Sequence, residues 1–107
     1  MTTAQRLVLT AIATSAAVAS LGAASQTISQ ADRSFAPGAI TVKAGDSLVF
    51  KNDDVVTHNA FSTSKGNEFN SKAQEPGQSA TIALKTAGTV EVRCAFHPKM
   101  RMTITVQ

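Results

Sequence analysis

Short segments in which apolar and polar side chains alternate fill most of the chain after residue 38. Val90 and Val92 show the two-residue period of a β-strand, and so do Ile104 and Val106. Gly- and Asp-containing turn signals, such as Gly45-Asp46, separate the segments. The pattern predicts strands at 39–43, 47–51, 79–84, 89–93 and 102–106. The one candidate for a short helix lies within residues 65–73.

Several short strands with turns at this spacing favour a single all-β domain, an antiparallel β-sandwich or barrel. The first 25 residues have a different character: Arg6 precedes the apolar run 7–13, and small residues then continue to Ser25. This order is typical of a secretory signal peptide. We therefore expect residues 1–25 to be cleaved, with Ala19 and Ala24 as alternative cleavage positions, and residues 26–107 to form the domain. A transmembrane anchor is the alternative, which several Thr and Ser residues in the segment disfavour.

Composition narrows the function further. The formal net charge is +3 and the charges are interspersed, and the chain has neither Trp nor Tyr. A nucleic-acid-binding surface would need a denser basic stripe, usually with aromatic residues, so we exclude that class. One Cys cannot form an internal disulfide, although small exported domains often depend on such bonds. A bound metal could stabilise the fold instead.

The segment between the last two predicted strands contains three potential metal ligands in seven residues: Cys94, His97 and Met100. The chain has only one other histidine, His58. Thiolate, two imidazoles and a thioether are the ligands of a type 1 (blue) copper site. The sequence therefore predicts one copper ion bound by His58, Cys94, His97 and Met100, with electron transfer as its function.

Three alternatives to this assignment fit the sequence less well. Met102 could replace Met100 as the axial ligand, but its alternation with Ile104 and Val106 predicts a position in the core. Zinc also accepts Cys and His, but methionine is a poor zinc ligand. An enzyme with Cys94 as nucleophile and His97 as base is disfavoured, because both lie in one tight loop and so small a sandwich offers little substrate cleft.

The same motifs resemble the cupredoxins of the amicyanin, plastocyanin and pseudoazurin group. The resemblance rests on Phe35-Ala36-Pro37, Ile40-Thr41-Val42, Asn52-Asp53-Asp54, His58-Asn59 and Cys94-x-x-His97-Pro98-x-Met100-Arg101. The short ligand loop is most similar to that of amicyanin. The resemblance implies a Greek-key β-sandwich, the four copper ligands named above, and an Asn59 that ties the two ligand loops together by hydrogen bonds.

The resemblance also implies a periplasmic, non-enzymatic electron carrier, which we expect to be monomeric and not inserted in a membrane after cleavage. We expect its partners to be redox proteins, such as a c-type cytochrome or a periplasmic dehydrogenase. An apolar patch around His97, with Pro37, Phe61, Phe96 and Pro98 as candidates, would form the docking surface. Lys99 and Arg101 at its edge predict an acidic partner. The alternative function is copper delivery or storage.

Phe96 is the unusual residue of the ligand loop, because related loops have proline at this position. Unlike proline, Phe96 has a backbone N–H, which we expect to donate to the Cys94 sulfur. Such a bond would stabilise the thiolate and raise the copper reduction potential.

Overall fold

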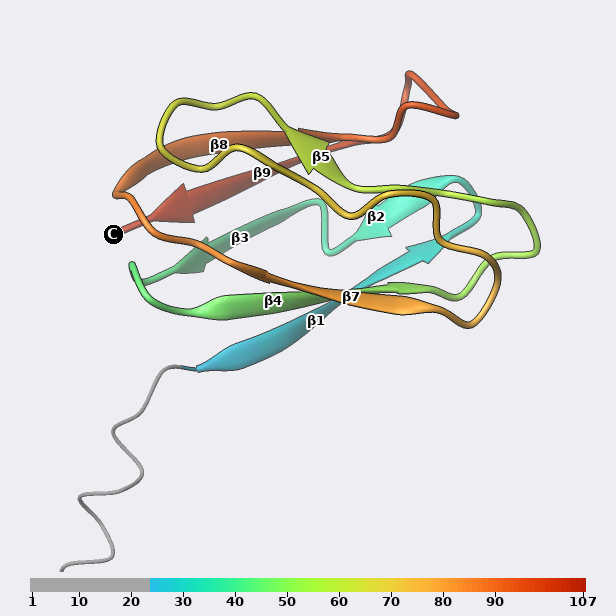
Figure 1. The fold of residues 1–107 in the computed structure, drawn as a ribbon, viewed down its shortest axis with the longest axis horizontal. Helices are drawn as coiled ribbons and strands as arrows, with labels where there is room; N and C mark the ends of the chain where they lie inside the picture. The colour runs from blue at the N-terminus through green and yellow to red at the C-terminus, as the bar shows by residue number, and fades with distance from the viewer. Residues whose placement is uncertain (1–23) are drawn as a thin grey trace, which may run out of the picture.

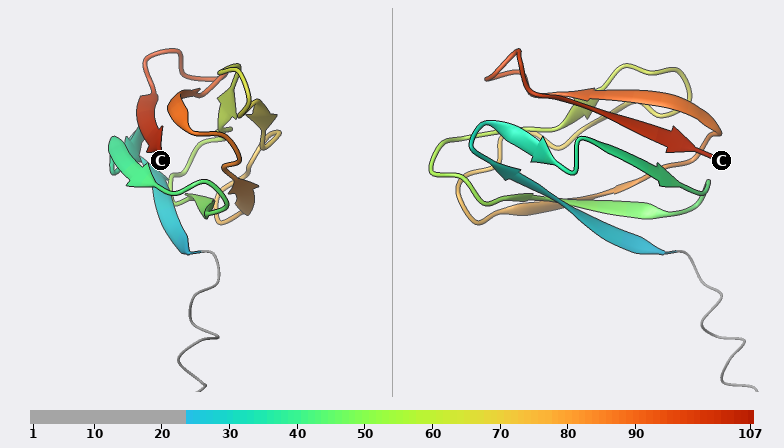
Figure 2. Two further views of the ribbon diagram at one scale, coloured as in Figure 1. Left: turned by 90° about the vertical axis from the view of Figure 1, so that its left-hand side faces the viewer. Right: turned by 180° about the vertical axis from the view of Figure 1, so that it is seen from behind.

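The computed structural model describes residues 24–107 as a sandwich of two β-sheets (Figures 1 and 2). The first sheet has the strand order β2-β1-β4-β7, and the second has the order β3-β9-β8-β5-β6. The strands are β1 (Ser25–Ala31), β2 (Ser34–Ala36), β3 (Ala39–Val42), β4 (Ser47–Asn52), β5 (Phe61–Ser62), β6 (Phe69–Asn70), β7 (Ser79–Ala83), β8 (Gly88–Arg93) and β9 (Arg101–Val106). The all-β, cupredoxin-like sandwich expected from the sequence is confirmed.

The core lies between the two sheets, where the alternating apolar positions meet. Leu48 and Phe50 of β4 are fully buried, as are Val90 and Val92 of β8, while the residues between them are more exposed. The side chains of neighbouring residues on a strand point to opposite faces, so each strand contributes one apolar row to the core. Phe50 also packs against Phe35 with the ring centroids 6.0 Å apart and an interplanar angle of 81°. This packing makes a rigid support for the loops at the ends of the sandwich.

The five predicted strands are all present, and each differs from its predicted range by one residue. The sheets are mixed rather than purely antiparallel, because β1 runs parallel to β4 and β3 runs parallel to β9. These pairs join segments that are distant in the sequence, so local patterns do not predict their direction. Within residues 24–107, no helix is long and apolar enough to cross a membrane.

The predicted short helix within residues 65–73 is wrong. This segment contains a turn and the two-residue strand β6. Gly66 and Lys72 both have positive φ, at 86° and 66°, which a right-handed helix does not allow. Asn67 is buried and its Oδ1 accepts the N–H groups of Lys85 and Thr86 at 2.7 and 3.2 Å. The segment is therefore held by a side chain that bonds to a distant turn.

The predicted signal peptide lies almost wholly outside the described residues and stays a prediction.

The loop from Cys94 to Met100 joins β8 to β9 and lies at the end of the sandwich opposite the C-terminus (Figure 1). That end carries the candidate site.

Candidate metal centre

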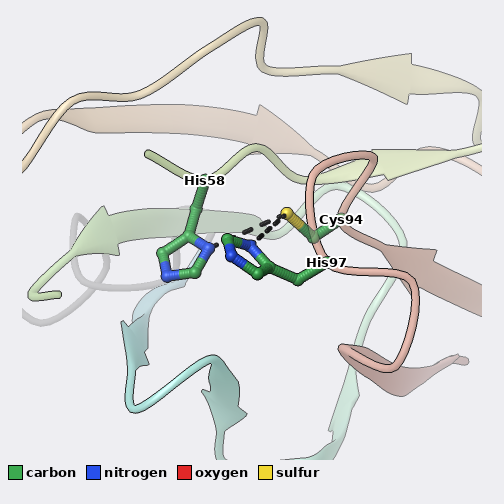
Figure 3. A group of neighbouring side chains, drawn as sticks. All are labelled: His58, Cys94 and His97. Carbon is green, nitrogen blue, oxygen red and sulfur yellow. Dashed lines mark hydrogen bonds between the residues drawn. The ribbon is translucent and has the colours of Figure 1, made fainter. Parts of the chain in front are cut away.

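Three side chains from two separate segments converge at this end of the sandwich (Figure 3). His58 lies between β4 and β5, and a backbone bridge to Gln74 holds it in place. In this bridge His58 N donates to Gln74 O at 3.1 Å, and Gln74 N donates to His58 O at 2.7 Å. Cys94 directly follows β8, and His97 lies in the loop after it. His58 and Cys94 are buried, whereas His97 is only partly buried. The predicted His58, Cys94 and His97 are therefore brought together.

The distances within this group fit a single metal ion. Cys94 Sγ lies 3.8 Å from His58 Nδ1 and 3.8 Å from His97 Nδ1, and all three ligand atoms lie within 4.8 Å of one another. Sulfur and imidazole ligands sit about 2.3 and 2.0 Å from a metal such as zinc, so two of them at about 120° would be roughly 3.7 Å apart. The thiolate is therefore placed as a trigonal His₂Cys arrangement requires.

Asn59 links the two ligand segments, as the resemblance implied. Its Oδ1 accepts the N–H of Ala95 at 2.7 Å, and its own N–H lies 3.4 Å from Cys94 Sγ. Its side-chain Nδ2 lies 3.3 Å from Asn70 Oδ1. Asn59 is 5% exposed, so these bonds are shielded from water. They fix the position of the sulfur relative to His58 before any metal binds.

The two candidate axial methionines occupy different places. Met100 is in the ligand loop, where its N–H donates to His97 O at 2.8 Å and closes a tight turn. Met102 is in β9 opposite Val92, and it packs in the core with Ile104. Both methionines are 2% exposed. The core position predicted for Met102 is confirmed, and Met100 lines the same surface hollow as His97.

Comparison with known proteins agrees with this geometry. A family model described as a cupredoxin-like domain matches residues 4–106. The chain belongs to the cupredoxin-like family.

Solved structures show that the fold of this cupredoxin is shared. A methionine-to-alanine variant of amicyanin in the Cu(I) form is 20% identical, with a TM-score of 0.72 over 78% of this chain and 82% of that one. A purple cupredoxin from Nitrosopumilus maritimus is 22% identical, with a TM-score of 0.69 over 77% of this chain and 99% of that one.

This cupredoxin is also similar to the methylamine utilization protein MauL of Methylorubrum extorquens, with which it is 35% identical over 71 residues. The match covers 65% of this chain and 61% of MauL, so this cupredoxin spans less than two thirds of that relative.

Family membership and the ligand geometry together give this cupredoxin a single type 1 copper site that contains His58, Cys94 and His97. The donor set fits copper, because thiolate sulfur is a ligand that Cu(I) prefers and imidazole suits both oxidation states.

His58 has a second partner that the sequence did not predict. Its Nε2 lies 2.9 Å from Asp54 Oδ2, on the side of the ring away from Cys94. The His58 hydrogen bond, followed by those from the N–H groups of Arg33 and Val55, holds the pKa of the Asp54 carboxyl far below its ordinary value. In the sequence, residues 52–54 contribute only to the family resemblance, and no local pattern indicates that the Asp54 carboxylate contacts His58.

His97 reaches the surface in an apolar hollow. Phe96, Pro98 and Met100 line this hollow together with the basic residues Arg33 and Lys99. Burial is the main cause of a lowered pKa of His97, and the nearby Arg33 charge adds to it, while Asp54 acts in the opposite direction. A lowered pKa keeps the imidazole neutral, which is the form that binds a metal.

The structure corrects two expectations about this surface. Cys94 Sγ accepts a backbone N–H from Asn59, and within residues 24–107 no hydrogen bond joins Phe96 N–H to that sulfur. Phe96 is instead 51% exposed beside His97. Of the other patch candidates, Pro98 lines the hollow and Phe61 lines an adjoining one with Pro98, whereas Pro37 lines neither.

Proposed function

We propose that this cupredoxin is a non-enzymatic electron carrier that exchanges single electrons between redox proteins, with Met100 as the fourth copper ligand. The observation that carries the proposal is the equal 3.8 Å separation of Cys94 Sγ from the Nδ1 atoms of His58 and His97. When bound there, copper supplies one-electron chemistry. A ligand plane that lies between the preferences of Cu(II) and Cu(I) favours rapid exchange.

The chain's own residues support this function by holding the ligands still. Asn59 fixes the Cys94 sulfur, and the bridge to Gln74 fixes the backbone of His58. Ligands that are already in place need little rearrangement when the charge of the ion changes. The turn from His97 O to Met100 N supports Met100 as the axial ligand, because it keeps the two side chains at one end of one loop.

The surface around His97 supports transient docking to an acidic partner. Phe96 and Pro98 offer an apolar contact, and Arg33 and Lys99 line the same hollow. Arg93 and Arg101 line the adjoining one. Among the described residues that line the two hollows, the charged side chains other than histidine are all basic. We propose a c-type cytochrome or a periplasmic dehydrogenase as the partner, and the similarity to MauL supports a place in methylamine utilization.

We further propose that the mature protein is a periplasmic monomer that does not insert into membranes. The expected signal peptide over residues 1–25 supports export to the periplasm.

The decisive experiment is visible spectroscopy of the copper-loaded protein combined with redox titration. An electron carrier is expected to show an intense blue thiolate-to-copper band that bleaches on reduction and returns on oxidation. A colourless protein that binds only Cu(I) would instead indicate copper delivery or storage.

The docking surface is tested by the salt dependence of electron exchange with an acidic redox protein. Lys99→Gln is expected to slow association at low salt and to weaken its dependence on salt. Lys43→Gln is the matched control, because Lys43 precedes the turn that bonds to the C-terminal residue, at the opposite end of the sandwich. Equal effects of the two variants would show that only net charge matters.

A further inference from the structure

His58 has one polar neighbour on each side of its ring. Its Nδ1 faces the Cys94 sulfur at 3.8 Å, and its Nε2 faces Asp54 Oδ2 at 2.9 Å. The His58 side chain is fully buried, and that of Asp54 is 9% exposed. An ionised carboxylate only accepts hydrogen bonds, so Nε2 must carry the proton. The lone pair of the neutral ring then lies on Nδ1, toward the metal site.

Asp54 is itself fixed by backbone groups. Its Oδ2 also accepts the N–H of Arg33 at 2.9 Å, its Oδ1 accepts the N–H of Val55 at 2.8 Å, and its own N–H donates to Asn52 Oδ1 at 2.8 Å. Arg33 lies in the turn between β1 and β2 with φ at 53°, so this turn is held against the carboxylate. These donors favour the ionised form of Asp54 and leave its orientation little freedom.

We propose that Asp54 is a positioning residue of the copper site, which fixes His58 as an Nδ1 donor and makes this imidazole a stronger ligand for Cu(II) than for Cu(I). This inference rests on the proposed function of the site. A carboxylate bonded to the far nitrogen of a ligating histidine increases the basicity of the ring. Its negative charge also stabilises the more highly charged ion, because the pair is shielded from water. Asp54 therefore lowers the reduction potential of the site.

The test compares Asp54→Asn with the matched control Asp53→Asn. Both variants remove one negative charge from adjacent positions, but Asp53 is exposed and contacts Ser29 and Lys51 rather than His58. Loss of a hydrogen-bond partner of a ligating histidine typically weakens metal binding 10- to 100-fold. At the potential where the wild type is half reduced, we therefore expect the ratio of Cu(I) to Cu(II) to be about tenfold higher in Asp54→Asn. This corresponds to a rise of about 59 mV. Asp53→Asn should change the ratio less than about twofold. Equal shifts in both variants, or no shift in either, would overturn the proposal.

A second measurement needs neither copper nor a folded variant. Long-range ¹H–¹⁵N spectra of the metal-free wild type, at mildly alkaline pH, report which nitrogen of each histidine carries the proton. We expect the Nε2–H tautomer for His58, and an Nδ1–H tautomer would refute the role of Asp54. A wild type without a blue band would count against the proposed electron carrier, whereas the His58 tautomer would still test the contact with Asp54.

Discussion

Removal of the Met102 side chain distinguishes the two methionines near the site, because only one of them belongs to the proposed ligand set. Met102 is 2% exposed and lies in β9 opposite Val92, within the apolar core. Met102→Ala would leave a cavity between tightly packed strands. We expect it to lower the stability of the fold without changing the copper site.

The expected loss can be estimated from the burial. Truncation of a buried methionine to alanine typically costs about 2–5 kcal/mol, and the strands around Met102 leave little room for collapse, so about 3 kcal/mol is a reasonable value. A domain of this size has a total stability of roughly 4–12 kcal/mol. The variant should therefore still fold, with a melting temperature lower by about 12–24 °C.

The assay is urea denaturation of the metal-free proteins, followed by circular dichroism. Copper must be absent, since ligand binding to the native state adds to the apparent stability. Copper-loaded samples then give the blue absorption band and the reduction potential. Met100→Leu serves as the comparison, because it conserves volume but removes the sulfur, at a stability cost below about 1.5 kcal/mol.

We expect Met102→Ala to keep the band and the potential of the wild type. Met100→Leu should raise the potential, because Cu(I) tolerates a three-coordinate site better than Cu(II), which prefers a fourth ligand. If Met102→Ala altered the band or the potential as strongly as Met100→Leu does, the assignment of the two methionines would be wrong. A stability loss below about 1 kcal/mol would show that Met102 does not fill the core as described.

Three further predictions concern positions that support the site and the fold. Asn59→Ala leaves the N–H of Ala95 without its acceptor, so we expect urea denaturation to show a free energy of unfolding lower by about 1–3 kcal/mol. The blue band should also shift, and an unchanged band would mean that Asn59 does not hold the sulfur. Asp46 accepts the backbone N–H of Lys43, and this bond is the main cause of a pKa below the ordinary value of Asp. Asp46→Ala should therefore destabilise the fold above about pH 4, and the difference from wild type should vanish as the pH falls through the native pKa; a difference that is constant with pH would contradict this. Gly66→Ala should lower the free energy of unfolding by more than about 1 kcal/mol, because φ is 86° and the new Cβ would lie 2.9 Å from Thr86 Cβ. An unchanged stability would refute the tight contact.

The sequence predicted what depends on local periodicity and on rare ligand types. The five predicted segments became strands with one-residue errors, because burial of one face repeats every second residue, whereas the longest strand, β1, was not predicted. One Cys and two His left a single way to build a His₂Cys set. The very short strands β5 and β6 carry too few residues to show any period.

Contacts that join distant segments could not be predicted in this way. The carboxylate of Asp54 belongs to a run of polar residues that ordinarily marks a turn, and its N–H does bond to Asn52 as in a turn. Its side chain serves the site only because the turn at Arg33, 21 residues earlier, lies against it and because His58 is turned inward by the bridge to Gln74. The same residue thus satisfies a local pattern and a distant one, and only the local pattern is visible in the sequence. Since a turn at this position would be equally well made by asparagine, the acidic side chain at position 54 is better explained by the buried imidazole that it contacts than by the turn.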